Sequence, residues 1–431
     1  MSTCLLLKVP EDVLCSLAIP DCRVLMMART CRSMFKALST RHSPVHVTVR
    51  KNVLTDARLA KEFTSGMYRM QALFRILHFE CVGFSNATRC VELNLCEFED
   101  LTFLHLRQLK MHHNQLGETH LMNLLYMLRF SSDLRSFEFT QQSLRSRHVP
   151  ALADAISCFP ALQVLNVESN FFAFDSLGTV LDAVQSSTLS TLKLSTNCCE
   201  TNSKTVKLCR VIHTSCTCLK VLDLSFMRLP RTTPFESLAG AISTCELLET
   251  LDLSRNHLHC GCLITILEST VGCRHLQSFN WSGNRLGSAG TFLLANHIAN
   301  NDAWKSSMRV MKLRCCDIYN NMLQLTNALT LCTSLHTLDI SGNAVLAHEV
   351  AALFQHERMR SLDISDNCIS DFGMRSLLRL AMHSNILHEL HVEGNHITMH
   401  SVRLLRKMKK TRGMNMTVPR ASCVCDTCNA P

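Results

Sequence analysis

The chain has 431 residues, of which 47% are hydrophobic and 18% are charged, and its formal net charge is +9. This charge is modest for the length, and no basic module interleaved with aromatic residues is present, which argues against a dedicated nucleic-acid-binding protein. No apolar run approaches the roughly 18 residues of a membrane span. The N-terminal CLLL is too short for a secretory signal.

The chain carries 24 cysteines, and some are adjacent, such as Cys198-Cys199 and Cys315-Cys316. Adjacent cysteines cannot easily join distant segments, and a chain of this length is not a small secreted disulfide scaffold. Free cysteine packs as a small apolar side chain. We therefore expect free thiols in a reducing compartment, the cytoplasm, with the nucleus as the alternative.

Residues 1–40 are expected to form a small helical module. Pro10 is followed by two acidic residues, which favours a helix start because proline suits the first turn and acids suit its positive end. Val13, Leu14 and Leu17 give this helix an apolar side, and Leu25 continues the helical spacing after a break.

This module resembles an F-box, which has a Leu-Pro-x-Glu start, an Asp-led second helix and a Cys-Arg-x-aromatic close. Pro10, Asp21 and Cys31-Arg32 take the corresponding positions, whereas Met34 replaces the aromatic residue. The resemblance implies docking of the small adaptor that links F-box receptors to a cullin. The predicted adaptor-binding residues are Pro10, Val13, Leu14, Leu17 and Leu25. The alternative is a helical cap that seals the following repeats.

Residues 41–104 are less regular. VHVTV at 45–49 alternates like a half-buried strand. Leu77, Leu93 and Leu109 follow at intervals of sixteen residues, too short for a strand, a full helix and two turns. We therefore expect either irregular early repeats or a capping region here, because terminal repeats must seal one side of the core.

Residues 105–415 contain eleven similar segments, typified by LETLDLSRNHL at 248–258. Leu251 and Leu253 lie two apart and share one face of a strand. Asn256 follows where the chain bends, and its buried amide can bond unpaired backbone groups. The segments begin at 106, 134, 162, 189, 219, 248, 276, 308, 335, 359 and 387. The asparagine recurs in eight of them: Asn114, Asn170, Asn197, Asn256, Asn284, Asn343, Asn367 and Asn395.

Helical stretches such as SAGTFLLANHIANN separate these segments, with apolar residues on one side. A repeat of about 28 residues with a full helix resembles the ribonuclease-inhibitor type of leucine-rich repeat, and NRLGSAG with Gly290 resembles that family's turn into the helix. The resemblance implies an α/β fold, a curved leucine-rich repeat solenoid with parallel strands on the concave face and helices on the convex face.

Six residues are candidates for contact with a protein partner on the concave face. Four aspartates lie between the inward leucines, and two cations interrupt their row. The aspartates are also explained if LDLS is simply a common form of the repeat. The cations could fix the register of a partner or form a local salt bridge. The candidates are Asp223, Asp252, Lys312, Arg314, Asp339 and Asp363.

The C-terminal tail, residues 416–431, contains Cys423, Cys425 and Cys428 in Cys-x-Cys-x-x-Cys spacing. A fourth ligand is missing nearby, so no zinc site is predicted. Acylation of these cysteines beside the preceding basic run would provide a membrane anchor. We expect a disordered tail, and contact with a membrane only if the cysteines are lipidated.

No phosphate-binding glycine loop, nucleophile elbow or His-Glu-x-x-His helix is present, so we expect a non-enzymatic, monomeric binding protein without a cofactor. The leading hypothesis is a substrate receptor of a cullin-type ubiquitin ligase, and the alternative is a scaffold or adaptor. A ribonuclease inhibitor is disfavoured because known members bind cationic enzymes through acidic surfaces, whereas this chain has a net charge of +9. A GTPase-activating repeat protein is disfavoured because such proteins usually carry an acidic tail, whereas the tail of this chain is basic.

Overall fold

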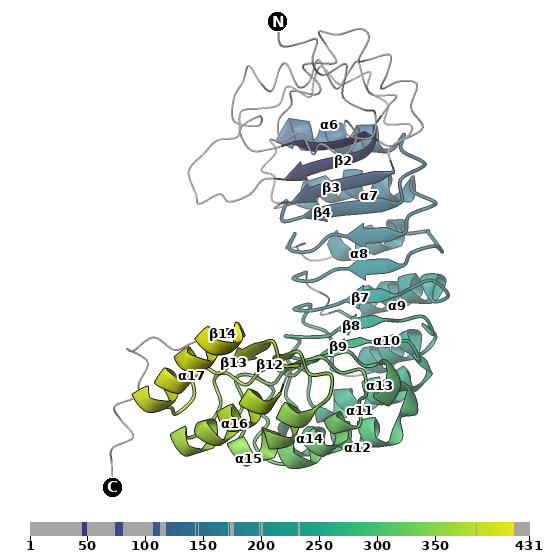
Figure 1. The fold of residues 1–431 in the computed structure, drawn as a ribbon. Coiled ribbons are helices and arrows are strands. Elements are labelled where there is room, and N and C mark those ends of the chain that lie inside the picture. Colours follow the sequence, from purple (N-terminus) through teal and green to yellow (C-terminus); the bar gives the residue numbers. More distant parts are fainter. Residues whose placement is uncertain are drawn as a thin grey trace, which may run out of the picture. The chain divides into compact units, whose positions relative to one another are not determined.

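The structure is a computed structural model that describes residues 45–49, 74–80 and 107–417, the last range except for 113–117, 143, 145, 171, 173–175, 198, 200, 232 and 385 (Figure 1). The predicted module at 1–40, with its adaptor-binding residues, and the cysteines of the tail lie outside the described residues. The chain divides into two compact units, Met1–Cys198 and Cys199–Pro431.

The first unit contains six parallel strands in chain order among its described residues. They are β1 (Val45–Val49), β2 (Phe74–Glu80), β3 (Gln108–His112), β4 (Ser136–Thr140), β5 (Val164–Asn166) and β6 (Thr191–Lys193). The helices are α6 (Glu118–Leu128), η4 (Ser146–His148), α7 (Val149–Ser157) and α8 (Ser176–Ala183).

The early strands keep the long period of the later repeats. β1 confirms the predicted strand at 45–49. Val47 pairs with Leu77, 30 residues later, and Leu77 pairs with Leu109, a further 32 residues later. Because β2 pairs directly with β3, the sixteen-residue spacing of leucines does not mark successive strands of the sheet.

The second unit continues the pattern with eight parallel strands in its described residues. They are β7 (Val221–Asp223), β8 (Thr250–Asp252), β9 (Ser278–Asn280), β10 (Val310–Lys312), β11 (Thr337–Asp339), β12 (Ser361–Asp363), β13 (Glu389–His391) and β14 (Asn415–Thr417). Each strand pairs with the next without a register shift, so equivalent residues of successive repeats lie side by side.

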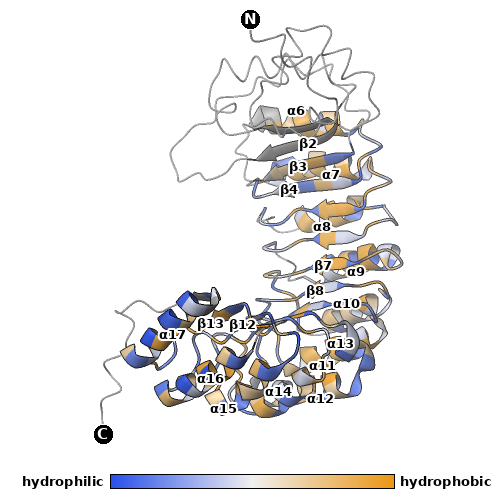
Figure 2. Cartoon of the chain, viewed as in Figure 1, coloured by the Kyte–Doolittle hydropathy of each residue, from blue (hydrophilic) through white to orange (hydrophobic). Residues whose placement is uncertain are grey.

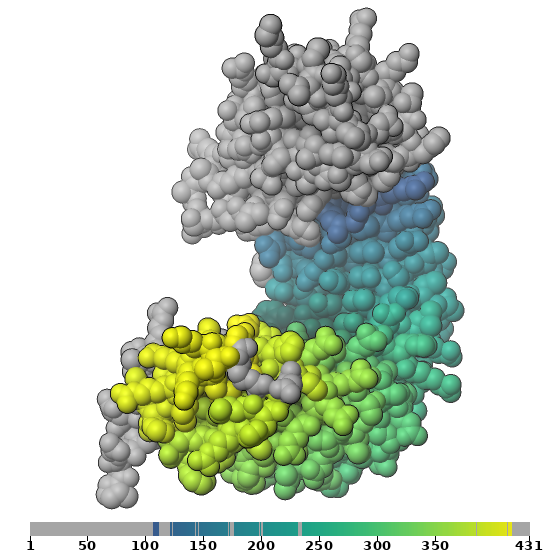
Figure 3. All heavy atoms as spheres, viewed as in Figure 1, coloured from purple at the N-terminus to yellow at the C-terminus, as the bar shows by residue number. Residues whose placement is uncertain are grey.

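The helices of this unit lie on one side of its strands, and we call the other side the open sheet face (Figure 1). The helices are α9 (Asn202–Ser215), α10 (Thr233–Ser243), α11 (Cys260–Ser269), η5 (Thr270–Gly272), α12 (Gly287–Asn300), α13 (Asp302–Ser307), α14 (Met322–Thr330), α15 (Ala347–Val350), η6 (Ala351–Gln355), α16 (Asp371–His383) and α17 (Met399–Arg412). In the space-filling view, the helical side of this unit forms a continuous packed surface (Figure 3). The predicted fold class, parallel strands alternating with helices, is confirmed.

The core lies between the strands and the helices. Leu251 and Leu253 are completely buried, as their spacing predicts, and Trp281 and Trp304 are the largest side chains with full burial. Hydrophobic and hydrophilic residues alternate along the helices, and α17 carries mostly hydrophilic residues (Figure 2). Burial of one side of each strand and each helix supplies the main favourable free energy of such a stack.

Where the asparagine is present, it bonds the backbone of its own repeat and of the preceding repeat, as predicted. Asn256 donates from Nδ2 to the carbonyl oxygens of Leu224 and Leu253, at 2.8 and 2.9 Å. Its Oδ1 accepts from the N–H of Met227 at 2.9 Å. Equivalent bonds occur at Asn170, Asn197, Asn284, Asn343, Asn367 and Asn395, whereas Asn114 lies outside the described residues. These amides form hydrogen bonds with buried backbone groups that have no partner in the hydrogen-bond ladders between the strands.

The helices are less uniform than the repeat pattern suggests. The shortest interval, 24 residues between the segments at 335 and 359, contains only the single turn of α15 and the 3-10 turn η6. The longest, 32 residues between 276 and 308, contains both α12 and α13. The strand spacing therefore stays fixed while the helical side absorbs differences in length.

Candidate functional site

The open sheet face of the second unit presents one row of side chains, formed by the third residue of each strand from β7 to β13. The register places these residues next to one another, and the middle residue of each strand points into the core. We call this set the central row: Asp223, Asp252, Asn280, Lys312, Asp339, Asp363 and His391. Five of the six predicted contact residues therefore share one row, and Arg314 lies two residues beyond Lys312.

The four aspartates of the central row have a structural role within their own turns. Oδ1 of Asp252 accepts a hydrogen bond from the Ser254 hydroxyl at 2.6 Å and from the Ser254 N–H at 2.9 Å. The same pair of bonds joins each of the other three aspartates to the serine two residues later. The recurring LDLS is therefore explained locally, because the carboxylate caps the turn that leaves the strand.

Two residues that the sequence pattern did not single out complete the row. Asn280 donates from Nδ2 to Oδ2 of Asp252 at 2.6 Å, so both carboxylate oxygens of Asp252 have partners. His391 lies beside Asp363 in the register and contacts Glu389, with Nε2 and Oε1 3.2 Å apart. Burial raises the pKa of Asp363; bonds from Ser365 oppose this, and the like charge of Asp339 adds to it.

Lys312 and Arg314 differ from the rest because both are exposed. A hydrogen bond with Cys315 and the negative charges of Asp339 and Asp363 raise the pKa of Arg314. Among the ion pairs of the described residues, none involves Lys312 or Arg314. The two cations therefore stand on the open face with their charged ends available to another molecule.

A second row borders the first, formed by the residue that precedes each strand. In the last four complete repeats this residue is always basic or a histidine, and we call Arg309, His336, Arg360 and His388 the edge row. Backbone bonds connect its members in order, because the carbonyl of Arg309 accepts from the His336 N–H at 3.0 Å and that of His336 accepts from the Arg360 N–H at 2.9 Å. The carbonyl of Arg360 accepts from the His388 N–H at 2.9 Å.

Sequence reasoning missed the edge row although its signal is present. The segments MRVMKLRCCDI, LHTLDISGNAV, MRSLDISDNCI and LHELHVEGNHI all carry arginine or histidine at their second position. In the three preceding segments that position is lysine, glutamate and glutamine, and Lys220 is neutralised by Glu249 at 2.8 Å. A comparison of repeats position by position would have shown this change of charge.

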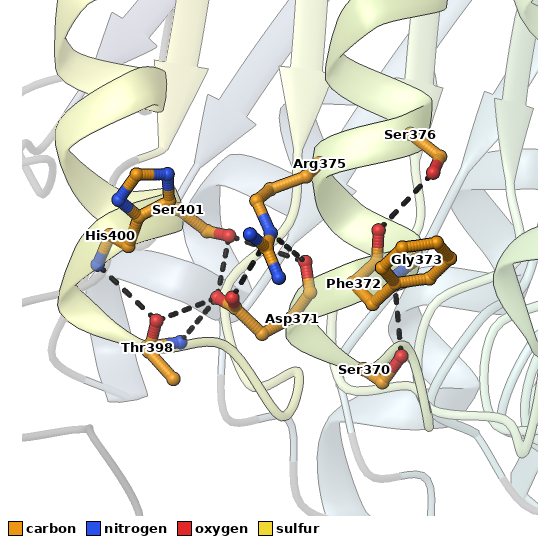
Figure 4. A network of polar contacts seen from close by, with 9 residues as sticks. All are labelled: Ser370, Asp371, Phe372, Gly373, Arg375, Ser376, Thr398, His400 and Ser401. Carbon is orange, nitrogen blue, oxygen red and sulfur yellow. Dashed lines mark hydrogen bonds and ion pairs between the residues drawn. The ribbon is translucent and has the colours of Figure 1, made fainter.

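On the helical side, a polar network joins the last two long helices (Figure 4). Oδ1 of Asp371 accepts from the Ser401 hydroxyl at 2.6 Å and from the N–H and hydroxyl of Thr398, both at 2.8 Å. Arg375 approaches Oδ2 at 3.3 Å. Burial would raise the pKa of Asp371, but these bonds and the arginine bring it below its usual range. The network connects neighbouring repeats and presents no group poised for chemistry.

A groove of about 500 Å³ lies beside this network, between α15 and α16. Its lining is largely apolar and includes Leu346, Leu377 and Leu380, and Phe372 at its rim is 75% exposed. No group of three or more His, Cys, Asp and Glu residues converges as a metal site in the described part of the chain. Of the helices described, none is long and apolar enough to span a membrane.

One comparison with known protein families agrees with a repeat fold. A family model described as Leucine Rich repeat matches residues 358–378. No match was found among the curated proteins. Among solved structures, the chain is similar to an internalin (InlF) from Listeria monocytogenes, with 16% identity, a TM-score of 0.42, and coverage of 74% of this chain and 82% of that one. It is also similar to actin-binding site 2 of leiomodin-1, with 19% identity, a TM-score of 0.26, and coverage of 30% and 81%.

The matched segment lies within one repeat, from the residue before Met359 to Leu378 in α16. Together with the parallel strands, the buried leucines and the asparagine bonds, it defines a leucine-rich repeat fold. Such a fold is consistent with protein–protein interaction, because its sheet displays many side chains on a stiff support.

Proposed function

We propose that this chain is a non-enzymatic receptor that holds a protein partner on the open sheet face of β7–β14. The observation that carries the proposal is the exposure of Lys312 in the middle of the central row, and of Arg314 two residues beyond it, where the neighbouring aspartates are bonded within their own turns. A partner carboxylate placed there would meet two cations already fixed to a strand and its turn. Charges arranged in this way favour the correct register and disfavour other partners.

We further propose that residues 1–40 attach the receptor to a cullin-type ubiquitin ligase, so that the bound partner is a ubiquitination substrate. This part rests on the sequence resemblance to an F-box at Pro10, Asp21 and Cys31-Arg32. The adaptor would dock on Pro10, Val13, Leu14, Leu17 and Leu25. If the segment is instead a cap, the chain is a scaffold or adaptor with the same partner-binding face and no connection to the ligase.

One co-precipitation experiment tests both parts. The tagged full chain is compared with K312E/R314E, with P10A/L14A and with R403E/R406E, a control that reverses two exposed charges on α17. Recovered proteins are identified by mass spectrometry, and melting curves establish that each variant is folded.

We expect K312E/R314E to lose the partner and retain the adaptor, because only the open face is changed. P10A/L14A should lose the adaptor and retain the partner, since the repeats remain folded. The control should retain both. A parent chain that never recovers the adaptor would remove the ligase assignment and leave the scaffold. A partner retained by K312E/R314E would show that the open face is not its binding surface.

A further inference from the structure

The edge row gives the N-terminal ends of β10 to β13 a local positive charge that the central row lacks. Arg309, Arg360 and His388 are exposed, and His336 is half-buried between the two arginines. Neighbouring strands of a sheet lie roughly 4.8 Å apart, so the four side chains form a line about 15 Å long. Their backbones are bonded in sequence, which keeps this spacing fixed.

The positive charge of this line is not neutralised by the surrounding described residues. None of the ion pairs found among those residues involves Arg309 or Arg360. Glu389 directly follows His388 in the sequence, but its carboxylate already has partners on the open face. It accepts hydrogen bonds from the Ser361 hydroxyl at 2.8 Å and from Asn415 Nδ2 at 2.9 Å, and it lies 3.2 Å from His391.

The side chains of the edge row also interact electrostatically with one another. Burial lowers the pKa of His336 first, and the positive charges of Arg360 and Arg309 lower it further. Repulsion among these groups is an energetic cost that an anionic ligand would relieve, because a negative charge beside the row would be attracted to all of its cations.

We propose that the edge row binds an acidic, Asp/Glu-rich segment of the protein partner, which runs across strands β10 to β13. This inference rests on the proposed function and specifies the chemistry of its partner. Lys312 and Arg314 follow Arg309 along the same repeat, so a second carboxylate of the partner can reach them from the open face. Arg309 and Arg360 carry the permanent charge of the row and lie two strands apart, at about 10 Å, so the segment is recognised by two carboxylates at about that separation, which a single isolated acid would not satisfy.

The test uses the full chain and a fluorescein-labelled oligoglutamate peptide, with binding followed by fluorescence anisotropy. R309E/R360E reverses the two arginines of the edge row, and R403E/R406E makes the same change of net charge on α17. We expect R309E/R360E to weaken binding on the order of tenfold, since exposed charge pairs contribute modestly and two attractions become repulsions. R403E/R406E should leave the affinity within about twofold.

Further arms separate this partner from other anions. Polyuridylate RNA and vesicles containing phosphatidylserine are titrated under the same conditions. Stronger binding of either probe, lost in R309E/R360E, would overturn the assignment of an acidic protein segment. Equal weakening by R403E/R406E would also overturn it, because binding would then follow net charge. If R309E/R360E fails to fold, R309Q/R360Q removes the same charges, and unchanged affinity in that variant contradicts the proposal.

Failure here is distinguishable from failure of the proposed function. If oligoglutamate does not bind but K312E/R314E still loses the co-precipitated partner, the open face remains the binding surface and its partner is not acidic. If K312E/R314E retains the partner, the proposed function fails whatever the peptide does.

Discussion

His297 shows how one half-buried side chain makes the stability of its repeat depend on pH. Its ring lies edge-on to Trp304 with centroids 4.7 Å apart, and its Nε2 is 3.2 Å from Nδ2 of Asn301. Burial lowers its pKa from 6.5 to about 4. The neutral ring can accept a hydrogen bond from the Asn301 amide, whereas a protonated ring would place two donors against each other.

The expected consequence is a loss of stability in acid. The folded pKa lies below the unfolded value, so between pH 6.5 and about 4 the unfolded chain binds a proton that the folded chain does not. Stability is therefore complete above this window and falls as the pH falls through it, by up to about 3 kcal/mol. Urea unfolding of the parent and of His297→Gln at pH 7 and pH 4 checks this. The advantage of the parent should shrink by about 2–3 kcal/mol at pH 4; a constant difference would contradict it.

At the scale of one element, the asparagine that follows most of the strands connects a repeat to the one before it. Asn256 bonds two carbonyl oxygens through Nδ2, and its Oδ1 accepts from the N–H groups of Met227 and Leu229. All of these groups are buried. In another repeat the same position is Cys316, whose thiol reaches two carbonyl oxygens at 3.5 and 3.4 Å.

We expect Asn256→Ala to destabilise the chain by about 3–5 kcal/mol, because several buried backbone groups lose their partners. Asn256→Cys should cost less, since a thiol can still donate weakly to the carbonyl oxygens as Cys316 does. Thermal unfolding monitored by circular dichroism measures both. Equal losses for the two variants would mean that the cost arises from altered packing and not from the hydrogen bonds.

These contacts also explain which features the sequence could predict. Buried leucines such as Leu251 and the amide of Asn256 recur because every repeat imposes the same local requirement on them. β14 lacks the leucine signature, and only its pairing shows that Met416 takes the position beside Leu390. The edge row was missed because its position faces solvent, where the fold accepts lysine, glutamate, glutamine, arginine or histidine equally.

At the scale of the molecule, each repeat of the second unit depends on its immediate neighbours. Leu251 is completely buried, and its strand position lies between Leu222 of β7 and Phe279 of β9. Packed helices follow the same order, with α10 contacting α9 and α11. In such a stack, stability is approximately the sum of repeat terms and nearest-neighbour interfaces, so damage should spread by short steps.

Leu251→Asp tests this directly, because it places an unpaired charge in the core of one repeat. We expect hydrogen–deuterium exchange to lose protection in β7, β8 and β9, while β13, four repeats further on, keeps protection close to that of the parent. Thr250→Asp is the matched control: Thr250 is the neighbouring residue on the open sheet face, where a carboxylate remains hydrated. This control should leave exchange in all of these strands nearly unchanged. Simultaneous loss of protection from β7 to β13 in Leu251→Asp would mean that the second unit unfolds as one cooperative body, and that a partner on its open face could stabilise every repeat at once.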